Sequence, residues 1–291
     1  MVRRTACAPA APGRENPDPL PEAVRFAKWH GLGNDYLLLE RDDVGSPLDP
    51  PLVRRLCDYH FGIGSDGVIE VVAAAGETAD VLIWNPDGST AELSGNGTRI
   101  AARWLARRAG ASEVRITVGP REVLARMREG LAVETEMGRI EVAPREPLEV
   151  DGTALEFTPV SVGNPHAVIA LEPERAELLR LGPLVEHHPR FPDRTNVQLV
   201  RVDSRREATV GVWERGAGET LSSGTSACAV AAAAIANGWC ESPVTIHLAG
   251  GDLLVEIDQE MNARLTGPAQ EICRGEVADE LLDDVSRGDG R

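Results

Sequence analysis

Lysine is almost absent from this chain, and the shortage narrows its chemistry. Lys28 is the only lysine among 291 residues, so arginine supplies nearly all of the positive charge. A pyridoxal phosphate enzyme needs a lysine for its Schiff base, and a P-loop needs one directly after its glycines. Lys28 stands in the context KWHGLGND, which fits neither site. Both of these cofactor classes are therefore disfavoured.

Cysteine and long apolar runs are also scarce. The five cysteines are scattered and never spaced as CxxC, which argues against a disulfide framework and a zinc site and indicates a reducing, cytoplasmic compartment. The longest apolar run, residues 227–236, is about half of what a membrane span needs. The net charge of −16 argues against a nucleic-acid partner. We expect no metal, no membrane and no nucleic acid.

The remaining composition is typical of a soluble globular protein, with 42% apolar and 26% charged residues. The length allows one large domain or two of ordinary size. Residues 1–22 hold five prolines and little that could pack, so they are predicted to be a disordered tail. Residues 276–291 are acidic and glycine-punctuated, and we expect a second tail there with one helical turn at 279–285.

Between the tails, strand-like and helix-like segments alternate. Alternation or β-branched enrichment predicts strands at 81–84, 114–118, 131–136, 159–162, 167–171, 196–202, 208–213, 244–248 and 253–257. Alanine, leucine and arginine content predicts helices at 51–60, 97–108, 173–181 and 225–237. The pattern indicates an α/β protein.

Two of these helices begin alike. The loop Ser94-Gly95-Asn96-Gly97 leads into one helix, and Ser223-Gly224-Thr225-Ser226 leads into another. A second echo pairs GND at 33–35 with GNPH at 163–166, so we hypothesise two duplicated α/β halves. Helix N-termini present unpaired N–H groups and a partial positive charge, so the two loops would make two anion-binding sites. Either loop alone is equally well explained as a helix cap and turn; the pair favours a function.

A set of polar residues near strand ends adds to these loops. Its members are Asn34, Asn85, Asn164, Asn196, His166, Glu214 and Arg215. Asparagines at strand ends usually form turns, and a lone histidine is more often a surface or core residue than a catalyst. Taken together, they suggest a ligand that carries both ammonium and carboxylate groups, such as an amino acid.

These residues belong to longer blocks that resemble a known family. The blocks are KWHGLGNDY, FGIGSDGV, WNPDGSTAELSGNGTR, VGNPHAV, TNVQLV, VWERGAGETLSSGTSACA and LTGPA. They are similar, in the same order, to the blocks of the diaminopimelate epimerase family. A single GNG or GNP block would mean little, whereas the ordered set is highly specific and covers nearly the whole chain between the tails.

The resemblance implies an isomerase that inverts one α-carbon of LL-2,6-diaminopimelate to give the meso form, without a cofactor, in the lysine and peptidoglycan precursor route. It implies an α/β (α+β) fold of two pseudo-symmetric domains, each a β-barrel-like sheet around a central helix, with the active site in the cleft between them. We expect the first domain at 23–122 plus 264–275 and the second at 123–263. The family also suggests a homodimer.

The chain departs from the family at the two positions that matter most. The resemblance implies two catalytic cysteines on opposite faces of the α-carbon, and Ser94 and Ser223 stand in their places. A free thiol titrates near pH 8.5, roughly, and a helix N-terminus lowers that pKa. A serine hydroxyl is a far weaker acid and needs an adjacent base. Cys228 lies too far around its helix to replace Ser223.

The remaining roles follow from the resemblance. Ser94 and Ser223 would occupy the acid/base positions, with His166 and Glu214 tuning proton transfer. The substrate-binding residues would be Asn34, Asn85, Gly95, Asn96, Asn164, Asn196, Glu214, Arg215, Gly224 and Thr225. Three explanations of the serines stay open: a retained form of the reaction, a divergent relative with other chemistry, or substitutions introduced to silence the enzyme. The alternatives for function are a same-fold isomerase of another substrate and a non-catalytic amino-acid-binding pseudoenzyme.

Overall fold

The computed structural model describes residues 24–91 and 94–286, so the predicted tail at 1–22 lies outside the described residues. The first half of the chain contains β1 (Arg25–Gly31), β2 (Asn34–Glu40), α1 (Arg41–Val44), α2 (Pro50–Cys57), β3 (Val68–Ala75), β4 (Thr78–Trp84), α3 (Gly95–Ala109), β5 (Glu113–Val118), β6 (Arg121–Met127) and β7 (Ala132–Arg139). The remainder contains β8 (Glu141–Val142), β9 (Glu146–Val150), β10 (Thr153–Ser161), β11 (Pro165–Ala170), α4 (Arg175–Glu186), β12 (Asn196–Ser204), β13 (Glu207–Glu214), β14 (Gly218–Glu219), α5 (Gly224–Ala236), β15 (Val244–Leu248), β16 (Gly251–Ile257), β17 (Asn262–Pro268), β18 (Gln270–Glu276) and α6 (Asp279–Ser286).

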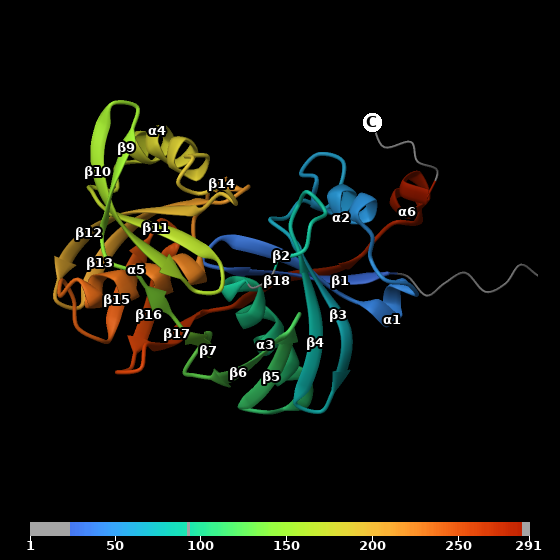
Figure 1. Cartoon of the computed structure of the whole chain (residues 1–291). Helices are drawn as coiled ribbons and strands as arrows, with labels where there is room; N and C mark the ends of the chain where they lie inside the picture. Colours follow the sequence, from blue (N-terminus) through green and yellow to red (C-terminus); the bar gives the residue numbers. More distant parts are fainter. Residues whose placement is uncertain (1–23, 92–93, 287–291) are drawn as a thin grey trace, which may run out of the picture.

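The two halves follow the same path. Strands β1 to β6 pair in the order antiparallel, parallel, antiparallel, parallel, antiparallel. Strands β10, β11, β12, β13, β15 and β16 repeat that order. In the first half α1 and α2 follow the second strand, β2, and α3 follows the fourth; in the second half α4 follows β11, and α5 follows β13 after the short strand β14. The predicted two-half α/β architecture is therefore confirmed, and Figure 1 shows the halves side by side.

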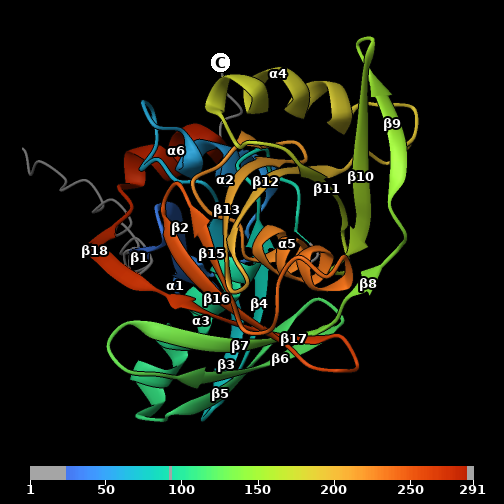
Figure 2. The ribbon, with the colours of Figure 1, turned by 90° about the vertical axis from the view of Figure 1, so that its left-hand side faces the viewer.

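Each half wraps its strands around one central helix. Helix α5 contacts strands on all sides, from β8 and β10 to β16 and β17, and the residues from Gly224 to Ala234 are all buried. A helix that is apolar all round must be enclosed in this way. Helix α3 is enclosed by β1 to β7 in the first half. Figure 2 shows α5 inside the second half, with α4 on its outer side.

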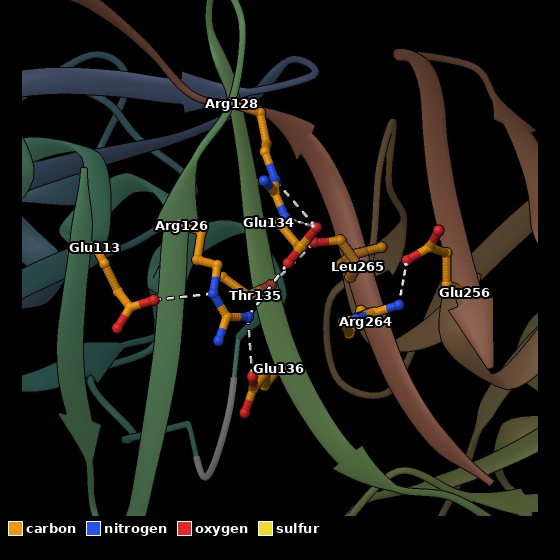
Figure 3. Close-up of polar contacts among 9 residues, drawn as sticks. All are labelled: Glu113, Arg126, Arg128, Glu134, Thr135, Glu136, Glu256, Arg264 and Leu265. Carbon is orange, nitrogen blue, oxygen red and sulfur yellow. Dashed lines mark hydrogen bonds and ion pairs between the residues drawn. The ribbon is translucent and has the colours of Figure 1, made fainter. Parts of the chain in front are cut away.

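The halves are joined where β7 pairs with β17. The two strands run antiparallel from Asn262 opposite Arg139 to Pro268 opposite Ala132. Inside this seam the buried Thr135 hydroxyl donates to the carbonyl of Leu265 at 3.3 Å. Figure 3 shows ion pairs crossing the neighbouring strands: Arg126 with Glu113, Glu134 and Glu136, Arg128 with Glu134, and Arg264 with Glu256. Each of these ion pairs joins strands within one half and none links β7 to β17, so the strand pairing and the buried core hold the seam.

The C-terminal end of the chain returns to the first half. After β17, the strand β18 pairs with β1, and α6 packs against α2. The helical turn expected at 279–285 is therefore a helix, Asp279–Ser286. The predicted domain boundaries after residues 122 and 263 fall within β6 and β17. Among the described residues, no helix is long and apolar enough to cross a membrane.

All four predicted helices exist, and α4 differs most from its prediction. It continues past the expected end at residue 181 and ends at Glu186, with Pro183 inside the helix. Gly182 explains the continuation: a Cβ there would lie 2.6 Å from the Cγ atom of Trp213, so the bare backbone packs directly on the indole ring. The indole ring therefore packs against the last turn of α4, beyond the predicted end of the helix.

Packing around α5 leads to a stability prediction. Ala231 is fully buried in the middle of the helix, whereas Ala236, its last residue, is exposed. Ala231→Leu should lower the free energy of unfolding by about 1–3 kcal/mol, because a close-packed interior has no room for the added carbons. Ala236→Leu is the control and should change it little. Denaturant unfolding measures both, and equal stabilities would contradict the enclosed position of α5.

Candidate functional site

The two central helices meet at their N-termini, and this contact brings the two halves together. Gly95 and Gly224 are the first residues of α3 and α5. A Cβ added to Gly95 would lie 2.9 Å from the Cα of Gly224, so only glycine leaves room here. Ser94 and Ser223 directly precede these glycines and are the N-caps of the two helices. The two predicted acid/base positions therefore flank one junction.

Free backbone donors surround this junction. Among the hydrogen bonds of residues 24–91 and 94–286, none uses the N–H of Gly95, Asn96, Gly224 or Thr225. All four residues are buried. A buried N–H without an acceptor is costly, and the first turn of a helix also carries partial positive charge. The junction is therefore built to receive an anionic group such as a carboxylate.

Ser223 has a base beside it. Its hydroxyl donates to Oε2 of Glu214 at 2.9 Å, and its Oγ accepts weakly from the N–H of Ser226 at 3.5 Å. Burial raises the pKa of the Glu214 carboxyl, and the bond from Ser223 opposes that rise. When Oγ of Ser223 accepts a proton from a substrate, the hydroxyl's own proton can pass to the Glu214 carboxylate. This pair can act as a general base.

Ser94 has a different neighbour. Its Oγ lies 3.1 Å from the hydroxyl of Tyr36 and accepts from the N–H of Gly97 at 3.0 Å. Burial raises the pKa of Tyr36, so the phenol stays protonated. Among the described residues, the Ser94 side can therefore donate a proton but holds no group that readily accepts one. Tyr36 was not among the predicted site residues, although it ends the KWHGLGNDY block.

A chain of side chains runs from a buried arginine to the junction. Arg99 is completely buried; its Nη1 donates to the carbonyl of Gly95 at 3.0 Å and its Nη2 to Oδ1 of Asn96 at 2.5 Å. Burial lowers the pKa of Arg99 to about 10. Because arginine only donates, the amide nitrogen of Asn96 must point the other way, toward Oδ1 of Asn34 at 3.0 Å and the carbonyl of Ser222 at 2.9 Å.

The same logic fixes the orientation of Asn34. Its Oδ1 accepts from Asn96, so its Nδ2 faces outward and donates to Oδ2 of Asp66 at 3.0 Å. An amide nitrogen carries two hydrogens, and one of them stays available. Asn34 and Asn96 therefore lie at the junction with fixed orientations.

Asn196 and Arg215 lie together on the second half. The Asn196 amide nitrogen donates to the carbonyl of Pro165 at 2.9 Å, and its Oδ1 accepts from the N–H of Arg215 at 3.0 Å. The Arg215 guanidinium donates to the carbonyl of Asp193 at 3.3 Å. The guanidinium thus keeps further N–H groups for a ligand carboxylate.

His166 reaches the junction only through other side chains. Its ring contacts Oδ1 of Asn164 at 2.9 Å and Nε2 of Gln198 at 3.1 Å, and Gln198 donates to Oγ of Ser226 at 3.0 Å. No hydrogen bond in the described part of the chain joins His166 to either capping serine. Burial lowers the pKa of His166 to about 3, so the ring is neutral at physiological pH. Because Nδ1 accepts from Gln198, the one ring proton lies on Nε2 and points to Asn164; the ring can orient the first turn of α5 but is not placed to exchange a proton with either serine.

Among the described residues, Asn85 makes no hydrogen bond to this arrangement. Its place in the first half corresponds to that of Glu214 in the second: Asn85 directly follows β4, and Glu214 is the last residue of β13. Asn85 stands nine residues before Ser94, and Glu214 stands nine residues before Ser223. Yet the Asn85 amide donates to Oγ of Ser89 at 2.9 Å and closes its own turn.

Burial raises the pKa of Cys228 to about 12, so this thiol does not replace Ser223 as a base.

Orphaned polar atoms gather at the same place. Among the buried side-chain atoms of the described residues that lack a hydrogen-bond partner are Thr98 Oγ1, Arg99 Nε, Gln198 Oε1 and Ser222 Oγ. All four belong to, flank or contact the first turns of α3 and α5. Buried polar groups are normally paired, and such a cluster indicates a polar ligand or water. No group of three or more acidic, histidine or cysteine side chains in the described ranges could hold a metal ion.

The neutral His166 makes stability depend on pH. Its pKa is about 3 in the folded chain, whereas an unfolded histidine titrates near 6.5, roughly. The unfolded state therefore binds a proton first as the pH falls, and folding loses about 1.4 kcal/mol per pH unit below that value. His166→Gln removes this titration. Between about pH 6 and about pH 5, the unfolding free energy of the variant should fall less than that of the unmodified chain, by the equivalent of one bound proton. If both chains lose the same free energy over this interval, the result would contradict a buried neutral ring.

Solved structures share this fold. A predicted epimerase from Pseudomonas aeruginosa superposes with a TM-score of 0.69 at 19% identity and covers 88% of this chain and 99% of its own. A hydroxyproline epimerase from Agrobacterium vitis, solved with trans-4-hydroxy-L-proline, gives a TM-score of 0.69 at 16% identity, over 89% of this chain and 93% of its own. At these identities the likeness establishes the architecture alone.

Sequence relatives are closer. The diaminopimelate epimerase of Moorella thermoacetica is 41% identical over 276 residues, which are 87% of this chain and 99% of that protein. The diaminopimelate epimerase of Desulfitobacterium hafniense is 38% identical over 283 residues, covering 89% of this chain and all of that protein. The model of the family described as diaminopimelate epimerase matches residues 26–142 and 158–272. The resemblance noted in the sequence is thus confirmed, and the chain belongs to the diaminopimelate epimerase family, a family of isomerases.

Proposed function

We propose that this chain is a cofactor-independent amino-acid epimerase that converts LL-2,6-diaminopimelate to meso-diaminopimelate by proton transfer at the α-carbon. One observation carries the proposal: two hydroxyls with unequal proton partners flank a junction of four free backbone N–H groups. Two relatives at 38% and 41% identity are diaminopimelate epimerases, which supports the choice of substrate. The reaction would serve lysine and peptidoglycan precursor synthesis in the cytoplasm, and we keep the homodimer as a further proposal.

The N–H groups of Gly95, Asn96, Gly224 and Thr225 would bind the α-carboxylate. Negative charge moves onto that carboxylate when the α-proton leaves, and preorganised donors at two helix N-termini stabilise it. Asn34, Asn85, Asn164, Asn196 and Arg215 would bind the remaining ammonium and carboxylate groups. Arg215 and Asn196 suit a carboxylate because their free hydrogens are donors.

Proton transfer would differ on the two faces. On one face the Cα–H bond breaks and its proton goes to Oγ of Ser223, while the serine's own proton passes to Glu214. On the other face Ser94 delivers its hydroxyl proton to Cα, and Tyr36 replaces it from its phenol. The second relay leaves a tyrosinate, which burial disfavours. Removal of the α-proton is therefore easier than delivery from the opposite face, and inversion is the slower outcome.

Ligand binding should depend on Arg215. Arg215→Ala removes a charged donor, and a hydrogen bond to a charged group contributes about 1.5–3 kcal/mol. Calorimetry with LL-diaminopimelate should show affinity lowered about tenfold or more. Arg180→Ala is the control, since Arg180 is exposed and pairs with Glu177. Absence of binding to the unmodified chain at millimolar ligand would show that the proposed substrate is wrong.

Placing thiols at positions 94 and 223 should raise the rate of epimerisation. Ser94→Cys combined with Ser223→Cys supplies groups that ionise near neutral pH at a helix N-terminus, and a positioned acid or base is worth about 10²–10⁴-fold in rate. Each single change should give less, because inversion needs an acid and a base on opposite faces. Coupled turnover of LL- to meso-diaminopimelate measures the rates, and circular dichroism checks the fold.

No gain in the double variant would defeat the epimerase proposal. Binding without any turnover would then favour an amino-acid-binding pseudoenzyme. Turnover of a different amino acid by the double variant would favour a same-fold isomerase.

A further inference from the structure

Glu186 is a buried carboxylate in an unfavourable place. It is the last residue of α4 and only 3% exposed. The C-terminal end of a helix carries partial negative charge, so an anion is disfavoured there, and burial adds a desolvation cost. Arg194 offsets part of this cost from 3.4 Å. A residue kept at such a cost needs a reason beyond filling space.

The donors to Glu186 bracket the predicted site residues. Its Oε2 accepts from the indole nitrogen of Trp213 at 2.8 Å, and its Oε1 accepts from the backbone N–H of Gly216 at 2.9 Å. Trp213 immediately precedes Glu214, and Gly216 immediately follows Arg215. One carboxylate thus holds the residues on both sides of the segment Glu214–Arg215. Within that segment, Glu214 accepts from Ser223 and Arg215 is the proposed ligand donor.

The first half offers an internal comparison. Glu70, on β3, is also fully buried and accepts from the indole nitrogen of Trp84 at 3.0 Å. Its other partners are Arg41 and the N–H of Leu48, which both precede Glu70 in the sequence. Within the described ranges, none of its hydrogen bonds reaches the residues after Trp84, where Asn85 stands. Tryptophan anchoring is therefore common to both halves and belongs to the fold. Of these two described carboxylates, Glu186 alone also accepts from the backbone beyond the strand end.

We propose that Glu186 is a positioning residue: by clamping Trp213 and Gly216 it holds the Glu214 carboxylate against Ser223 and aims Arg215 at the ligand. This rests on the proposed proton abstraction by the Ser223–Glu214 pair. Glu186 does not touch the junction itself, so it acts only through the 213–216 segment.

Glu186→Gln tests the clamp, because glutamine has one acceptor oxygen where two donors converge. Amide hydrogen exchange followed by mass spectrometry should be at least tenfold faster across residues 215–220. Incorporation of deuterium at the α-carbon of LL-diaminopimelate in heavy water should fall at least tenfold. The matched control is Glu70→Gln, which likewise leaves one acceptor oxygen where a buried tryptophan and two further donors converge. At matched folded fraction, it should leave both readouts within about twofold.

A thiol background separates positioning from general stability. In Ser223→Cys the thiolate needs Glu214 less, so adding Glu186→Gln should lower deuterium incorporation by a clearly smaller factor than in the serine chain. Equal factors in both backgrounds, or unchanged exchange at 215–220, would overturn the proposal. If no variant incorporates deuterium at all, the proposed epimerase function fails, and backbone exchange at 215–220 alone decides whether Glu186 is a clamp.

Discussion

The contact between the first turns of α3 and α5 is the constraint on which the rest of the structure depends. Two helix N-termini, each with unpaired N–H groups and partial positive charge, approach until Gly95 and Gly224 leave no space for a side chain. Such ends repel in isolation. The enclosing strands of each half, joined through β7 and β17, force them together. The fold therefore keeps unpaired N–H groups and partial positive charge at the junction, and an anionic ligand would stabilise both.

Duplication placed two equivalent positions around this contact, but their chemistry has diverged. Ser223 donates to the carboxylate of the last residue of β13, whereas the equivalent Asn85 bonds within its own turn and the hydroxyl of Ser94 contacts a tyrosine. The clamp by Glu186 occurs on the carboxylate side only. These differences all concentrate proton-accepting ability on one face. The chain keeps the symmetry of its backbone while its acid/base groups are asymmetric.

Local signals predicted much of this, and tertiary contacts account for the rest. The serine–glycine loops mark both helix N-termini, because capping is a local event. Strand β2 was missed: it is buried on both faces, so its run from Tyr36 to Leu39 has no period of two. Tyr36 and Glu186 escaped notice because their partners lie 58 and 27 to 30 residues away along the chain. Asn85 fitted the pattern of the other asparagines, yet its amide is used within its own turn.

The central claim is that the two faces of the site are unequal, and isotope exchange in heavy water tests it most directly. LL-diaminopimelate would be incubated with the unmodified chain, and the deuterium content of recovered substrate and of meso product would be followed over time. An unequal site predicts that labelled LL-diaminopimelate accumulates ahead of the meso product, because Ser223 and Glu214 return a solvent proton to the face they deprotonated. Label that appears only in the meso product, with recovered substrate unlabelled, would contradict the account.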